Sequence, residues 1–226
     1  MSIYRCPWLP RTSCRVLGLC CLVGRSCDNR KMLTSWSVEC GAEDPVLVVP
    51  WSDAGGLHFV DLRENPYDLD QITEAEAHPA LMQALRALNA TRSPVFTAKC
   101  DAWPMDDDEL ETMQMELGLT EAEAPAGFTS YIDLIWRERT LFVSFHQQEQ
   151  RLVRLGRLVD PLDHPYAAVD AVLRPALVDL TGPQEGFAVT LYVKALGTDA
   201  VHAYEHWTRA LEAVVTVLRS KELSLS

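Results

Sequence analysis

Apolar and polar residues alternate along several stretches after Met32, whereas elsewhere apolar residues recur every three or four positions. Alternation is typical of β-strands, whose side chains point to opposite faces in turn, and the longer repeat is typical of helices. The alternating stretches that predict strands are residues 93–103, 127–136 and 186–196. Two short apolar runs, residues 45–51 and 57–62, flank a turn and predict a hairpin.

Apolar residues spaced by three or four positions predict helices between these strands. Pro79 suits the first turn of a helix that ends near Asn89. Asp106 and Glu109 form a D-x-x-E start, in which an acidic first turn complements the helix dipole. Further helices are predicted at residues 140–159, at residues 165–173 and from about Asp199 toward the C-terminus.

This succession of elements predicts an α+β fold. Residues 32–226 contain no internal repeat and no linker long enough to separate two domains. We therefore expect a single layered domain, built on a mixed sheet of about five strands that helices cover. The long C-terminal helix is expected to pack on this sheet. The order of the strands within the sheet does not follow from the pattern.

Residues 1–31 differ in composition from the rest of the chain. They carry six Lys or Arg residues against a single Asp, five of the seven cysteines and no Ala. We expect a disordered or mis-called N-terminal extension that does not belong to the domain. The alternative is a signal-like segment, because basic residues precede an apolar stretch from Val16 to Gly24.

The remaining residues are strongly acidic, with 14 Lys and Arg against 31 Asp and Glu. Such a surface repels phosphate backbones, so we do not expect a nucleic-acid partner. Residues 32–226 contain only Cys40 and Cys100, which is typical of a reduced, cytoplasmic protein. We expect a soluble protein that has no membrane partner and no cofactor.

Residues 202–206 read H-x-x-E-H, a short motif that is typical of a metal site. In this inverted zinc-protease pattern, two histidines one helical turn apart hold a metal and the Glu activates its bound water. The apolar stripe of the same helix consists of Val201, Tyr204, Trp207, Leu211, Val214, Val215 and Leu218. His202 and His206 lie on the opposite, solvent-facing side, so we predict no metal site there.

A second candidate site is distributed over the three predicted strands, each of which has one apolar and one polar face. The polar side chains are Lys99 and Asp101, Tyr131 and Asp133, and Tyr192 and Lys194. If these strands are neighbours, the residues form one polar face of the sheet. That face is either a solvated surface with cross-strand charge pairs or a concave site for a small polar ligand or a protein partner.

The opposite, apolar face of the first of these strands contains a cysteine. Alternation places Cys100 there with Phe96, Ala98 and Ala102, where a cysteine acts as an inert small hydrophobe.

No phosphate-binding loop, dinucleotide fingerprint or hydrolase nucleophile motif occurs in the sequence. The leading hypothesis is a binding or interaction module of unknown ligand whose site is the polar sheet face. The alternative hypothesis is a hydrolase, either metal-assisted through His202 and His206 or using Asp101 and Asp133 as acid and base.

Overall fold

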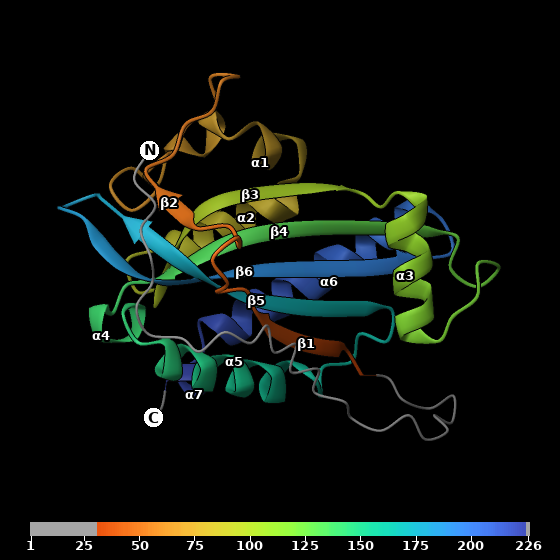
Figure 1. Ribbon diagram of the computed structural model, residues 1–226. Helices are drawn as coiled ribbons and strands as arrows, with labels where there is room; N and C mark the ends of the chain where they lie inside the picture. Colours follow the sequence, from red (N-terminus) through yellow and green to blue (C-terminus); the bar gives the residue numbers. More distant parts are fainter. Residues whose placement is uncertain (1–30, 225–226) are drawn as a thin grey trace.

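A computed structural model describes residues 31–224, and within them six strands form one mixed sheet (Figure 1). The strands are β1 (Leu33–Val38), β2 (Leu47–Val49), β3 (Val95–Pro104), β4 (Ala126–Trp136), β5 (Ala167–Val178) and β6 (Gln184–Gly197). Their order is β1-β5-β6-β4-β3, and β2 also pairs with β5. Strands β3, β4, β6 and β5 are antiparallel neighbours, whereas β1 and β2 run parallel to β5.

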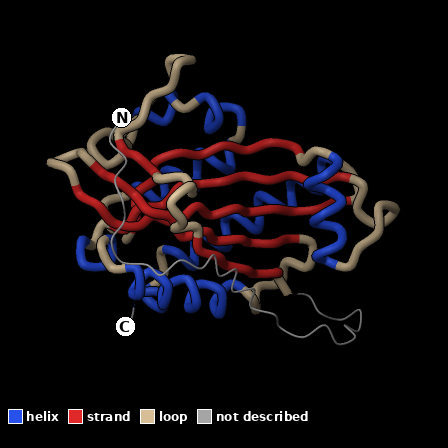
Figure 2. Tube along the Cα trace, viewed as in Figure 1, coloured by secondary structure: helices blue, strands red, loops and turns tan. Residues whose placement is uncertain are grey.

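Helices lie on both faces of the sheet (Figure 1). They are η1 (Asp68–Gln71), α1 (Thr73–Ala77), α2 (Pro79–Asn89), α3 (Asp107–Leu117), α4 (Arg139–Phe142), α5 (Phe145–Val159), α6 (Ala200–Leu218) and α7 (Lys221–Ser224). Helices α2 and α6 cover one face, and α3 crosses the other face at one end of the strands (Figure 2). The predicted α+β domain, with a mixed sheet and a C-terminal helix packed on it, is confirmed.

The main hydrophobic core lies between the sheet and the pair α2 and α6. Alternate residues of the central strands, such as Ile132 and Leu191, meet Leu85 of α2 and Trp207 of α6 there. Trp207 is fully buried, and its indole Nε1 donates a 2.9 Å hydrogen bond to Ser130 Oγ on β4. This contact anchors the C-terminal helix to the centre of the sheet.

Two predicted helix starts are confirmed by their capping contacts. Asp106 and Glu109 form a capping box at the start of α3, and the helix ends at Gly118, whose φ of 69° suits a residue without a Cβ. Asp199 caps α6 by accepting from the His202 amide at 2.9 Å. Both starts are local, so a sequence pattern is enough to locate them.

The predicted helix at residues 165–173 is wrong, because these residues begin β5. This strand lies between β1 and β6, and most of its residues are buried. A strand that is covered on both faces has apolar residues at consecutive positions, which hides the two-residue period. Its Ala-rich sequence then satisfies a helical pattern equally well.

The predicted single helix at residues 140–159 is two helices, α4 and α5. The helix is interrupted at Ser144, because the Ser144 side chain caps the start of α5 by accepting a hydrogen bond from the Gln147 amide. Gln148 is fully buried and its amide nitrogen donates to the carbonyl oxygens of Leu141, Phe142 and Phe187. The buried glutamine therefore satisfies carbonyl groups where α4 ends.

The predicted hairpin at residues 45–62 is only partly present. Leu47–Val49 form β2, but the second apolar run contains no strand, and an isolated bridge joins Ser52 to His58. Strand β1 was not predicted.

Of the expected extension at residues 1–31, all but Lys31 lies outside the described residues. Within residues 31–224, no helix combines the length and apolar composition needed to cross a bilayer.

Candidate functional site

The six residues predicted from the sequence lie on three adjacent strands, on the sheet face opposite α2 and α6. In the register of the sheet, Asp101 of β3 pairs with Tyr131 of β4, which pairs with Tyr192 of β6. The same row continues to Asp170 of β5 and Ser35 of β1. Side chains in one row of a sheet project to the same side.

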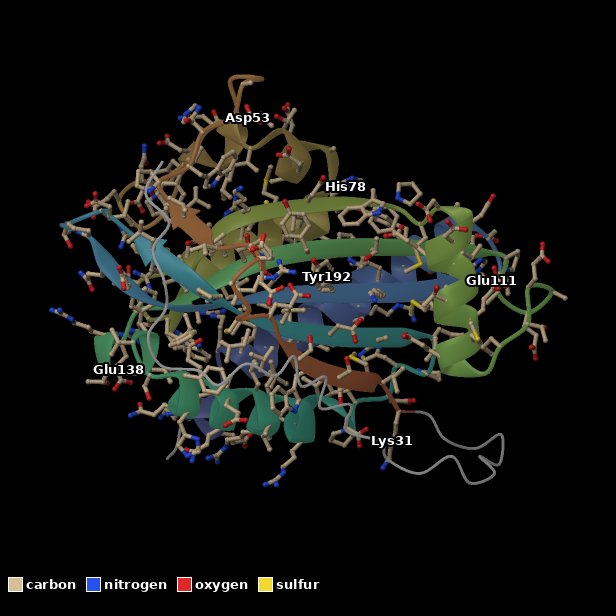
Figure 3. All side chains as sticks on the ribbon, in the orientation of Figure 1. Lys31, Asp53, His78, Glu111, Glu138 and Tyr192 are labelled. Atoms are coloured by element: carbon tan, nitrogen blue, oxygen red, sulfur yellow. The ribbon has the colours of Figure 1, made fainter. Side chains whose placement is uncertain are left out.

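The neighbouring rows complete this polar face. One row contains Lys99, Asp133 and Thr190, and the row on the other side contains Trp103 and Lys194. We call these residues, together with Tyr131, Tyr192, Asp101 and Asp170, the polar face. Figure 3 shows Tyr192 near the middle of the sheet, between α3 and the segment that carries β2.

A β-bulge positions Lys99. Thr97 pairs with Leu134 and Cys100 pairs with Ile132. Two residues of β3, Ala98 and Lys99, therefore lie opposite one residue of β4, Asp133. The extra residue reverses the alternation beyond it. As a result, Lys99, Asp101 and Trp103 lie on the same side of the strand as Phe96 and Ala98.

The bulge corrects the faces that simple alternation assigns to β3. Cys100 and Ala102 do not share a face with Phe96 and Ala98, because they join the core under α2 and α6. Burial raises the pKa of the Cys100 thiol to about 12, so this cysteine is a poor nucleophile, as its apolar surroundings predict. A bulge leaves no clear mark in the pattern, which is why the sequence did not reveal it.

An ion pair joins β5 and β6 on the polar face. Lys194 Nζ lies 2.6 Å from Asp170 Oδ2, and Ser35 Oγ donates to Asp170 Oδ1 at 2.5 Å. Burial disfavours the Lys194 ammonium, but the carboxylates of Asp170, Glu116 and Glu109 together outweigh this effect and raise the pKa of Lys194. Lys194 therefore stays protonated, and its positive charge is balanced by the Asp170 carboxylate.

A second network surrounds Asp133, whose side chain is buried. Thr190 Oγ1 donates to Asp133 Oδ1 at 2.6 Å and accepts from Arg174 Nη1 at 3.1 Å. Arg174 also pairs with Glu39 at 2.9 Å. Burial raises the pKa of Asp133, although the Thr190 hydrogen bond and the Arg174 charge partly oppose the rise. The residue is 5% exposed, so a charge on it is costly.

Aromatic side chains line the same face. The ring centroids of Trp103 and Tyr131 are 6.1 Å apart, and those of Tyr131 and Tyr192 are 6.2 Å apart. At the other end, Trp51 donates its indole N–H to the Ala98 carbonyl at 2.9 Å, and Lys99 Nζ lies 4.7 Å from the centroid of a Trp51 ring. The face therefore combines charged groups with four partly buried aromatic rings.

Apolar clusters bound the polar face at both ends. Beneath α3, Met113 packs with Ala168 and Leu196. At the opposite end, Val49 of β2 packs with Phe96 and Ile135. A surface depression along α5 and a small cavity between α5 and β1 both lie away from the polar face. The polar face is thus a surface with an apolar cluster at each end.

The sequence missed residues that hold the polar face together. Asp170 and Arg174 were not recognised because β5 reads as a helix, and Glu39 lies outside the predicted strands. Trp51 lies in the predicted run 45–51, but the pattern does not connect that run with the polar face. For Asp170 and Arg174 the signal was present, since they occupy alternate positions of one stretch, but a helical repeat fitted that stretch equally well.

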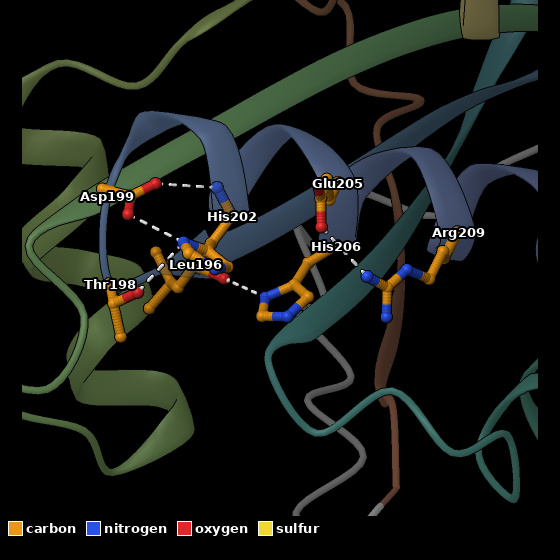
Figure 4. A network of polar contacts seen from close by, with 7 residues as sticks. All are labelled: Leu196, Thr198, Asp199, His202, Glu205, His206 and Arg209. Atoms are coloured by element: carbon orange, nitrogen blue, oxygen red, sulfur yellow. Dashed lines mark hydrogen bonds and ion pairs between the residues drawn. The ribbon is translucent and has the colours of Figure 1, made fainter.

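The H-x-x-E-H histidines engage different local partners (Figure 4). His202 is exposed and its Nδ1 lies 2.7 Å from Asp199 Oδ2. His206 is half-buried, with Nδ1 2.7 Å from the Leu196 carbonyl oxygen and its ring stacked on Tyr166. Among the described residues, no three His, Cys, Asp or Glu side chains gather as a possible metal site.

The apolar stripe of α6 is also slightly different from the expectation. Tyr204 and Trp207 pack in the core, but Val201, in the first turn of the helix, is 66% exposed. The predicted solvent exposure is therefore correct for His202 and only partly correct for His206.

No protein-family model, curated protein or solved structure matches this chain.

Proposed function

We propose that this protein binds a small polar ligand and that the polar face of the sheet is its binding site. The observation that carries the proposal is the row Asp101, Tyr131 and Tyr192 on three adjacent strands, with Asp133 one row away. Ligand sites combine aromatic surface with a few positioned polar groups, and this row has both.

Partial burial favours a binding site over an ordinary solvated sheet face. The side chains of Lys194 and Asp170 are 27% and 24% exposed, and each is held by a partner on a neighbouring strand. An ordinary solvated face presents long, mobile charged side chains that contribute little. Groups held in fixed positions on a rigid sheet are better suited to recognise a ligand.

An acid/base enzyme acting on the bound ligand is a second candidate. It is favoured by Asp133, because burial raises the pKa of this carboxyl while Asp101 lies one row away on the adjacent strand. Two carboxyl groups in different surroundings suit the roles of acid and base. Turnover of a bound compound, lost in both Asp133→Asn and Asp101→Asn, would support this candidate.

We also propose that the protein works in the cytoplasm and does not bind nucleic acid. Two cysteines in residues 32–226 fit a reducing compartment, and the excess of acidic residues disfavours phosphate backbones. Cell fractionation would test the compartment. Recovery of the protein outside the cytoplasm would contradict it.

The binding proposal is testable by NMR on the full chain labelled with ¹⁵N. A library of small polar metabolites is titrated, and hits are expected to shift the amides of residues 99–103, 129–133 and 190–194. Tyr131→Ala should weaken those hits, whereas Arg209→Gln, on the exposed side of α6, should not. Hits that shift only other regions, or no hits at all, would refute the proposal.

A further inference from the structure

The arrangement of rings and carboxylates points to a particular class of ligand for the polar face. We infer that the site recognises an organic cation, namely a quaternary ammonium or methylated amine. This inference rests on the proposed function and specifies the chemistry of its ligand.

Neighbouring aromatic rings of the polar face are inclined to one another. The planes of Trp103 and Tyr131 meet at 64°, and those of Tyr131 and Tyr192 meet at 48°. Rings at such angles do not form a flat stacking platform. Each ring face carries partial negative charge, and several inclined rings are the usual surroundings of a bound quaternary ammonium.

Carboxylates lie beside these rings. Asp101 pairs directly with Tyr131 in the sheet register, and within residues 31–224 it makes no ion pair; its Oδ1 accepts from the Ala102 amide at 2.7 Å. Burial, with repulsion from Asp133 and Asp101, raises the pKa of Tyr131. Negative charge on these carboxyl groups disfavours the anionic form of Tyr131 and favours a cation beside its ring.

Two cations on this side of the sheet are held by carboxylates. Lys194 is paired with Asp170, and Arg174 is paired with Glu39. An anionic ligand would have to compete for these groups while facing Asp101. A cationic ligand does not have to break these ion pairs, because it can pair with Asp101. The charge arrangement thus favours a cation over an anion.

Lys99 and Trp51 provide an internal example of the proposed contact. The Lys99 ammonium lies 4.7 Å from the Trp51 ring centroid, at one edge of the polar face. Its charge lies near Trp51 and Asp133, whereas Tyr131 pairs with Asp101 one row away and Trp103 lies one row further. The site for a second, ligand-borne cation is therefore the group of Asp101, Trp103, Tyr131 and Tyr192.

The test compares choline with 3,3-dimethylbutan-1-ol, which has the same shape but carries no charge. In ¹⁵N NMR titrations of the full chain, choline should shift the amides of Asp101, Tyr131 and Tyr192 with a Kd of about 1 mM. The neutral analogue should bind at least about tenfold more weakly. Raising the salt concentration should weaken choline binding, because a carboxylate contributes to it.

Matched variants test separately what the Tyr131 ring, the Tyr131 hydroxyl and the Asp101 charge contribute to choline binding. Tyr131→Phe retains the ring and should keep choline binding, whereas Tyr131→Leu should weaken it about tenfold. Asp101→Asn should also weaken it about tenfold. The amide spectrum of each variant reports whether the fold is retained, and Arg209→Gln serves as the remote control.

The outcomes distinguish this inference from the proposed function. If the neutral analogue binds as tightly as choline, or if choline shifts other residues or none, the cation inference is wrong. If uncharged metabolites then still shift the amides of the polar face, the proposed binding function stands without it. If neither choline nor any library compound shifts them, both proposals fail.

Discussion

Thr190 Oγ1 donates a 2.6 Å hydrogen bond to the Asp133 carboxyl across β6 and β4, and this carboxyl is almost completely buried. The hydrogen bond favours the charged form of Asp133, while burial opposes it more strongly. The balance between these two effects governs how the polar face responds to pH and to substitution.

Asp133→Asn should change the pH dependence of stability. Because the folded protein holds the Asp133 proton more tightly than the unfolded chain does, this group stabilises the fold fully below its ordinary pKa of 3.8. That contribution is lost as pH rises through the raised folded pKa. The free energy of unfolding of Asp133→Asn, relative to wild type, should therefore increase across this window in urea titrations. An exposed control, Asp70→Asn, should show no such trend, and a parallel pair of curves would contradict the argument.

Thr190→Val should destabilise the protein at neutral pH by about 1–3 kcal/mol, since the Asp133 carboxyl loses its hydroxyl donor. Thr190→Ser retains the donor and should recover most of the loss. In the Asp133→Asn background, the effect of Thr190→Val should shrink. Equal costs in both backgrounds, measured by urea unfolding, would show that Thr190 contributes through packing alone.

Trp207→Phe should cost about 2 kcal/mol of unfolding free energy, because it removes the indole donor and leaves Ser130 Oγ buried without that partner. Ser130→Ala in the same protein removes the acceptor as well. The double variant should be less destabilised than the sum of the two single variants. Simple additivity would mean that the indole contributes only volume to the core.

His206→Ala should lower stability by about 1 kcal/mol, because the imidazole loses the Leu196 carbonyl and its stacking on Tyr166. His202→Ala should have a smaller effect, since His202 is exposed. Elemental analysis of the purified protein should show the same zinc content in both variants and in wild type. Near-stoichiometric zinc that disappears in both variants would instead restore the metal hypothesis.

The sequence predicts most of the elements whose signals are local. The capping residues Asp106 and Asp199 mark the starts of α3 and α6, and the alternation in β4 and β6 assigns Tyr131 and Tyr192 to the polar side. Strand β5 was missed because both of its faces are largely buried, and a strand of that kind loses its two-residue period.

The candidate site was only partly predictable for a related reason. Alternation shows which side chains share a face within one strand, but it carries no information about which strands are neighbours. The adjacency of β3, β4 and β6 is set by the packing of the whole sheet. The contacts that Asp170 and Arg174 of β5 make on this face therefore could not be predicted, because β5 lies two strands from Asp133 and three strands from Asp101.

The extra residue in β3 places two consecutive side chains, Ala98 and Lys99, on the same side of the strand. Before it, Val95 and Thr97 face α2, and after it Cys100 and Ala102 do. Deleting either Ala98 or Lys99 would leave one residue opposite Asp133 and restore strict alternation, while Asp101 and Trp103 keep the faces they have now. The bulge thus adds one side chain to the polar side of the strand without changing the face of any other residue.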